Sequence, residues 1–186
     1  MDAVVAEHIY TPEDFLVLRD QRGFELLDGG LKEKSCGMEA SIVSVNLTTL
    51  LGKYVKANKL GHVMGSDCPY QVFADHPNHV RKPDGSFVAL GRLPDEKPFR
   101  DHCTVAPDLT FEIVSPDDLA EALNDKVVEF LGAGVRLLWV VYPASKTIHV
   151  LRPDGSAAFL SEAGELSGED VIPGFSCRVA DVFSDL

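Results

Sequence analysis

Apolar residues recur along the chain with two different spacings, and these spacings predict a mixed α+β fold. Between residues 38 and 58 they return every three or four positions, at Val43, Leu47, Leu50 and Tyr54, which is the spacing of a helix with one buried face. Short apolar runs between turn residues predict strands at residues 62–73, 84–90, 109–114, 136–142 and 147–152. We therefore expect a mixed β-sheet (α/β/α-like) flanked by two main helices.

Helix-start and turn signals add the remaining elements. The segment Thr11–Asp14 supplies an N-cap, a first-turn proline and an acid at the third helical position, which predicts a short helix. An Asp-Gly pair in the middle of residues 24–32 predicts the tight turn of a hairpin. The segment Ser115–Asp118 repeats the helix-start signal and predicts a second main helix that ends near Gly132.

The length fits a single domain. With 186 residues, of which 45% are hydrophobic and 25% charged, the chain can bury a full core. We expect one domain over residues 1–186, in which residues 1–37 form an N-terminal helix-hairpin cap and residues 38–186 form the core.

Targeting signals and cysteine spacing point to the cytoplasm. The first seven residues contain acids and lack the layout of a secretory signal, and the apolar run at 135–142 is too short to span a bilayer. The four cysteines show no CxxC spacing, so we expect free thiols at Cys36, Cys68, Cys103 and Cys177.

The net charge of −12 argues against a broad nucleic-acid-binding face, because proteins that contact many phosphates normally carry a basic one. The basic residues are unevenly spread, however. Lys53, Lys56 and Lys59 cluster at the end of the long helix, and Arg81-Lys82 directly precede Pro83. This clustering predicts a local basic rim on an acidic protein.

Three charged residues occupy positions where the apolar pattern predicts a core. Asp84 begins one predicted strand and Glu112 interrupts another. Lys126 falls inside the apolar stripe of the second helix, between Ala122 and Leu119 when the residues are projected at 100° each. A lysine in that position is expected to pair with a carboxylate, and Glu112 and Asp84 are the candidates.

Two carboxylates on neighbouring strands beside an inward lysine are typical of a metal site that hydrolyses phosphodiesters. Carboxylate oxygens suit Mg²⁺ or Mn²⁺, so we expect Asp84 and Glu112 to be the metal ligands. Asp108 competes with Asp84, but four residues along a strand place it roughly 13 Å from Glu112, which is too far for one ion. Glu39, at the edge of the long helix's apolar stripe, could approach the site as a further acid.

The order of these residues resembles the Uma-two family of restriction-endonuclease-like proteins, in the PD-(D/E)xK nuclease superfamily. The resemblance spans nearly the whole chain and is carried by Arg81-Lys82-Pro83-Asp84, by Glu112-Ile113-x-Ser115-Pro116 and by Trp139-Val140-Val141. It implies a restriction-endonuclease-like fold and a metal-dependent endonuclease that acts on DNA, and superfamily members often pair as homodimers.

The resemblance also implies roles for individual residues. Asp84 and Glu112 would be the motif acids and Glu39 the helix acid. The motif lysine would stand at position 114, where this chain has Val114, so the lysine has moved to the next helix as Lys126. Family members often carry an aspartate where this chain has Tyr142.

Simpler interpretations stay open for each residue. Glu112 and Lys126 would also suit a buried ion pair, Asp84 a turn cap, and Glu39 a first-turn acid favoured by the helix dipole. Solvated charges are the simpler interpretation for other residues, namely Glu121, Glu129 and the turn residues Asp75, His76 and His79.

The whole chain likewise has alternatives to an active endonuclease. The net charge, Val114 and Tyr142 favour a catalytically relaxed nuclease fold that acts as a binding or regulatory protein. A nuclease that needs a basic partner subunit to reach nucleic acid is a third hypothesis.

Overall fold

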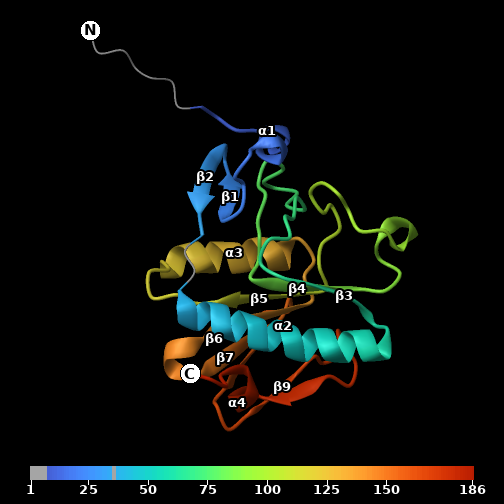
Figure 1. Cartoon of the computed structure of the whole chain (residues 1–186), viewed down its shortest axis with the longest axis vertical. Helices are drawn as coiled ribbons and strands as arrows, with labels where there is room; N and C mark the ends of the chain where they lie inside the picture. The colour runs from blue at the N-terminus through green and yellow to red at the C-terminus, as the bar shows by residue number, and fades with distance from the viewer. Residues whose placement is uncertain (1–7, 35–36) are drawn as a thin grey trace.

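A mixed six-stranded sheet forms the centre of the molecule. The computed structural model describes residues 8–34 and 37–186, and Figure 1 shows their arrangement. The strand order is β3-β4-β5-β6-β7-β8, and only β5 and β6 pair in parallel. The strands are β3 (Gly61–Met64), β4 (Gly85–Ala89), β5 (Leu109–Ile113), β6 (Leu137–Tyr142), β7 (Thr147–Leu151) and β8 (Ala157–Leu160).

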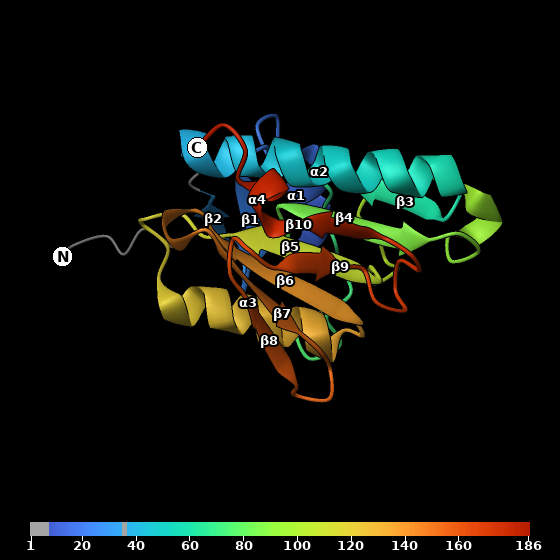
Figure 2. The same ribbon diagram turned by 90° about the horizontal axis from the view of Figure 1, so that it is seen from below.

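Two helices cover opposite faces of this sheet, as Figure 2 shows. They are α2 (Met38–Asn58) and α3 (Ala120–Gly132). Strand β6 has apolar side chains on both faces, as expected for a central strand. Leu137 and Trp139 pack in the cluster on the α2 side, whereas Leu138 and Val140 pack in the cluster that contains α3. The predicted sheet between two main helices is confirmed.

The predicted helix-hairpin cap is also present. It consists of α1 (Pro12–Val17), β1 (Phe24–Leu27) and β2 (Gly30–Glu33). Thr11 and Asp14 form the expected capping box. The cap is fastened to the core by a small cluster of Phe15, Leu26 and Val80, and by backbone hydrogen bonds in both directions between Leu26 and Val80.

The remaining elements lie near the C-terminus or in turns. They are β9 (Glu165–Ser167), β10 (Ser176–Arg178), α4 (Val179–Val182), and the short 3-10 turns η1 (Pro94–Glu96) and η2 (Pro143–Ser145). Within the described residues, Cys68, Cys103 and Cys177 are free thiols as predicted, and Cys36 lies outside those residues. The described part of the chain contains no helix with the length and hydrophobicity needed to cross a bilayer.

Two element boundaries differ from the sequence-based expectation. Helix α3 starts at Ala120, not after Ser115, because the Asp118 carboxylate accepts a hydrogen bond from the Ser115 N–H and closes a separate turn. Leu119 is therefore the residue before the helix and is 74% exposed. The predicted strand at 62–73 is reduced to β3, and its second half is an irregular segment tied by isolated bridges at Tyr70.

Gly85 connects the candidate aspartate to the core, and we expect Gly85→Ala to destabilise the protein by about 1–3 kcal/mol. A Cβ at this position would overlap the ring of buried Phe111. Gly52→Ala is the matched control, because Gly52 is a helical position with open space around it. That change should be neutral or stabilise by up to about 1 kcal/mol. Urea unfolding of both variants measures the difference, and equal effects would contradict the packing argument.

Candidate active site

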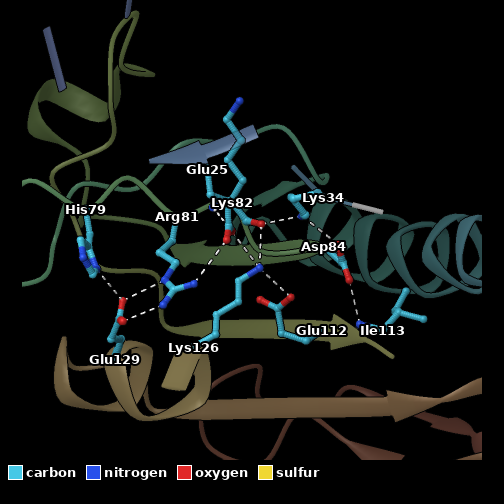
Figure 3. A network of polar contacts seen from close by, with 10 residues as sticks. All are labelled: Glu25, Lys34, His79, Arg81, Lys82, Asp84, Glu112, Ile113, Lys126 and Glu129. Carbon is cyan, nitrogen blue, oxygen red and sulfur yellow. Dashed lines mark hydrogen bonds and ion pairs between the residues drawn. The ribbon is translucent and has the colours of Figure 1, made fainter. Parts of the chain in front are cut away.

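Asp84 and Glu112 line one cavity and come from neighbouring segments of the sheet. Asp84 directly precedes β4, Glu112 lies within β5, and the Asp84 Oδ2 atom accepts a hydrogen bond of 2.8 Å from the backbone N–H of Ile113. The cavity has a volume of about 230 Å³. Six acidic and four basic side chains line it, so it favours cations over anions. Figure 3 shows both carboxylates from close by.

Lys126 reaches the same cavity from α3 and is buried there. Its Nζ atom lies 2.9 Å from Glu112 Oε2, 2.9 Å from Glu25 Oε1 and 3.0 Å from the Lys82 carbonyl oxygen. An ammonium group has three hydrogens, so these contacts use all of them. The predicted pairing of Lys126 with Glu112 is therefore present, but its second carboxylate is Glu25 rather than Asp84.

Four residues that line the cavity come from the cap, and two of them, Glu25 and Lys34, contact Lys126 or Asp84; neither was predicted from the sequence. Glu25, on β1, pairs with Lys126 and also accepts a hydrogen bond of 2.7 Å from the Lys82 backbone N–H. Lys34, just after β2, places its Nζ atom 2.9 Å from Asp84 Oδ1 and 2.6 Å from the Lys82 carbonyl oxygen. Strand alternation gives no signal for Glu25, because it puts Glu25 and the buried Leu26 on opposite faces, and yet both side chains are buried.

The polar network continues away from the cavity through Arg81. Its guanidinium contacts Glu25 at 3.4 Å and binds both Glu129 oxygens, at 2.8 and 2.6 Å. Glu129 in turn lies 3.3 Å from His79 Nδ1. Figure 3 traces this series of contacts.

This network corrects three expectations. Glu129 and His79 are not solvated: the Glu129 side chain is 12% exposed and the His79 side chain 5%. Arg81 and Lys82 do not form a basic rim, because both are buried. Arg81 is held by carboxylates, and the Lys82 ammonium donates to the Gln21 carbonyl oxygen. Their burial cannot be inferred from local sequence, since the covering groups come from the cap and from α3.

The two carboxylates that share Lys126 have opposite pKa shifts. Burial raises the pKa of Glu112 to about 7, because the charge of Lys126 offsets only part of the desolvation and Asp84 adds repulsion. Burial acts in the same direction on Glu25, but Lys126, Lys34 and Arg81 outweigh it and lower the pKa of Glu25 to about 2. For Lys126 itself, burial lowers the pKa and the nearby carboxylates more than compensate, so the ammonium stays charged.

A family model matches almost all of this chain. The model described as "Uma2: Putative restriction endonuclease" matches residues 12–180. The chain belongs to the Uma2 family.

A crystal structure has the same fold as this Uma2 chain. It is described as "a putative nuclease belonging to DUF820 from Anabaena variabilis", has 20% sequence identity and superposes with a TM-score of 0.77. The match covers 94% of this chain and 98% of the other. This likeness shows that the two chains share one fold, in agreement with the predicted mixed sheet between helices. No curated protein matches the chain.

The two other residues considered from the sequence, Glu39 and Asp108, do not line this cavity. Glu39 is exposed in the first turn of α2 and lines a different pocket, together with Val114 and Tyr142. Asp108 is buried and holds the Ala89 backbone N–H at 2.8 Å and the Arg92 guanidinium at 2.7 Å. Asp84 lines the cavity with Glu112 and Lys126, whereas Asp108 does not.

The donor atoms in the cavity fit a hard divalent ion. Glu112 Oε1 is buried and has no hydrogen-bond partner among the described residues, although a buried carboxylate oxygen normally has one. Asp84 Oδ1 is held by Lys34, so an ion at this oxygen would compete with that ammonium. Among the described residues that line the cavity, the candidate ligands are carboxylates, with no imidazole or thiol, and this set matches the preference of Mg²⁺ and Mn²⁺.

Proposed function

We propose that the chain is a metal-dependent nuclease that hydrolyses phosphodiester bonds of DNA, with Asp84 and Glu112 as ligands of Mg²⁺ or Mn²⁺. The observation that supports this most is the buried Glu112 Oε1, which has no hydrogen-bond partner among the described residues and belongs to a residue that lines one cavity with Asp84. Membership of a family described as "Putative restriction endonuclease" agrees with it. When bound, the ion would polarise the phosphate and lower the pKa of a water molecule.

Neighbouring residues orient the carboxylates of Asp84 and Glu112. Lys126 holds Glu112 Oε2 and so fixes the direction of the second oxygen, Oε1. Ile113 does the same for Asp84 by donating its N–H to Oδ2. Lys126 is the motif lysine that has moved to α3, and its charge would stabilise negative charge that develops on phosphate.

Lys34 would be the second cation of the reaction. All hydrogens of Lys126 are used within the protein, whereas Lys34 has two acceptors, Asp84 Oδ1 and the Lys82 carbonyl oxygen. Its side chain is 19% exposed and lines the cavity. We infer that Lys34, rather than Lys126, donates directly to a phosphate oxygen of the substrate.

Isothermal titration of Mg²⁺ and Mn²⁺ into the wild type and Asp84→Asn tests the ligand assignment. We expect saturable binding in the wild type and its loss in Asp84→Asn, because the replacement removes the charged oxygen that lines the cavity. Asp125→Asn, an exposed change on α3, is the matched control and should bind like the wild type. Equal binding by Asp84→Asn and the wild type would overturn the assignment.

The alternative is a nuclease fold that binds without cleaving. The occupied hydrogens of Lys126 and the burial of Arg81 and Lys82 favour it, because they leave fewer free cations for phosphate. Absence of ion binding in the wild type would select this alternative.

A further inference from the structure

Three ligand side chains meet where the cap contacts the core, at the far end of the polar network from the cavity. Asp28 lies in the turn between β1 and β2, and His76 and His79 lie in the turn before Val80. One ligand atom from each of the three side chains lies within 4.8 Å of the other two. The two imidazole rings stack with their centres 4.4 Å apart.

His79 is placed between two carboxylates. Its Nε2 atom lies 2.9 Å from Asp28 Oδ1, and its Nδ1 atom lies 3.3 Å from Glu129 Oε2. A neutral imidazole has one N–H and can donate to only one of them. The other nitrogen then faces a carboxylate with its lone pair, which is favourable only if a cation stands between them. A second proton would serve, and so would a metal ion.

Glu129 gives His79 the support that metal-binding histidines usually have. Such a histidine commonly donates its second N–H to a carboxylate, which fixes the ring and its tautomer. Glu129 occupies that position and is itself fixed by two hydrogen bonds from Arg81, at 2.8 and 2.6 Å. His79 is thus a buried and oriented ligand, with Nε2 directed at Asp28 and His76 nearby.

We propose that Asp28, His76 and His79 bind a divalent transition-metal ion of the zinc class. Two imidazoles and one carboxylate suit Zn²⁺, Co²⁺ or Ni²⁺, whereas Mg²⁺ prefers oxygen ligands. This site is separate from the cavity of Asp84 and Glu112 and does not depend on the proposed nuclease activity.

The bound ion joins the cap to the core. Asp28 belongs to the tip of the hairpin, and both histidines belong to the segment that precedes β4. The same hairpin supplies Glu25, and Lys34 directly follows it. The ion therefore stabilises the hairpin in the position from which it completes the cavity.

Titration of Zn²⁺ and Co²⁺ into tag-free, chelator-treated protein tests the site. With Mg²⁺ in excess to occupy the carboxylate cavity, we expect one equivalent of Zn²⁺ or Co²⁺ to bind, with a visible Co²⁺ absorption band, and this equivalent to be lost in His76→Ala and Asp28→Asn. Both residues are exposed, so these variants should keep the fold. Asn also tolerates the positive φ of 49° at position 28. Circular dichroism and a urea transition confirm folding.

Controls separate this site from other sources of binding. Asp75→Asn, an exposed neighbour, should bind Zn²⁺ like the wild type. Glu129→Gln should weaken binding by about 10- to 100-fold, as removal of a supporting carboxylate usually does. Unchanged binding in His76→Ala and Asp28→Asn, a thiolate-to-cobalt absorption band, or no saturable binding by the wild type would each overturn the proposal.

Discussion

Glu112→Gln is expected to lower metal-dependent DNA cleavage by about 10²- to 10³-fold, the usual loss when one preorganised electrostatic contact is removed from an active site. The replacement keeps the shape of the side chain and removes the charge of Oε1, the oxygen that no described residue hydrogen-bonds. Single-turnover cleavage of a supercoiled plasmid, with Mg²⁺ or Mn²⁺ in excess, measures the effect.

The same substitution should leave the fold intact, which separates a chemical role from a structural one. Burial raises the pKa of Glu112 to about 7, so the ionised carboxyl adds little stability near neutral pH. We expect the free energy of unfolding to change by no more than about 1 kcal/mol, against the larger cost typical of a broken buried pair. A folded Glu112→Gln variant that cleaves at the wild-type rate would contradict the proposed function, whereas an unfolded one would show that Glu112 is mainly structural.

The parts of the fold that depend on local periodicity could be predicted from the sequence. The α2 boundaries, the hairpin and the two faces of β6 follow from the spacing of apolar residues and from turn residues. Lys126 was also found in this way, because Val127 and Phe130 define the buried face of α3 on which it lies. Leu119 itself is exposed and lies before the helix, so it is not part of that buried face.

Partners that come together only by tertiary contact could not be predicted. Nothing local indicates that a residue of the cap hairpin will share Lys126 with Glu112, since Glu25 lies far from both in sequence. The same applies to Glu129 and His79, which are 50 residues apart in sequence and 3.3 Å apart in space. Charges that look solvated on one element become buried when a second element covers them.

The cap is consequently part of the site and not an accessory to it. Lys34 holds Asp84, Glu25 holds Lys126, and both converge on the backbone of Lys82. Figure 3 shows that the groups from the hairpin lie among those from the sheet and α3. A chain that lacked residues 24–34 would leave the cations and carboxylates of the cavity unbalanced.

Lys126→Met should destabilise the protein by about 3–5 kcal/mol, the range measured when one partner of a buried ion pair is removed. Methionine fills a similar volume, so the loss is electrostatic rather than a cavity effect. The substitution leaves the buried carboxylates of Glu25 and Glu112 without their shared cation. It also removes one of the hydrogen-bond donors to the Lys82 carbonyl oxygen. Urea unfolding monitored by fluorescence of Trp139 gives the free energy.

A double-mutant cycle identifies the source of that loss. Glu25 stays ionised near neutral pH, because its pKa is lowered to about 2. The destabilisation by Lys126→Met therefore comes mainly from leaving the Glu25 carboxylate buried without its cation. Glu25→Gln keeps an oxygen that can accept from the Lys82 N–H. Combining the two changes should therefore recover about 1–3 kcal/mol relative to the sum of the single effects. Strict additivity would show that Lys126 and Glu25 contribute independently, and that the cap and α3 are not coupled through this ion pair.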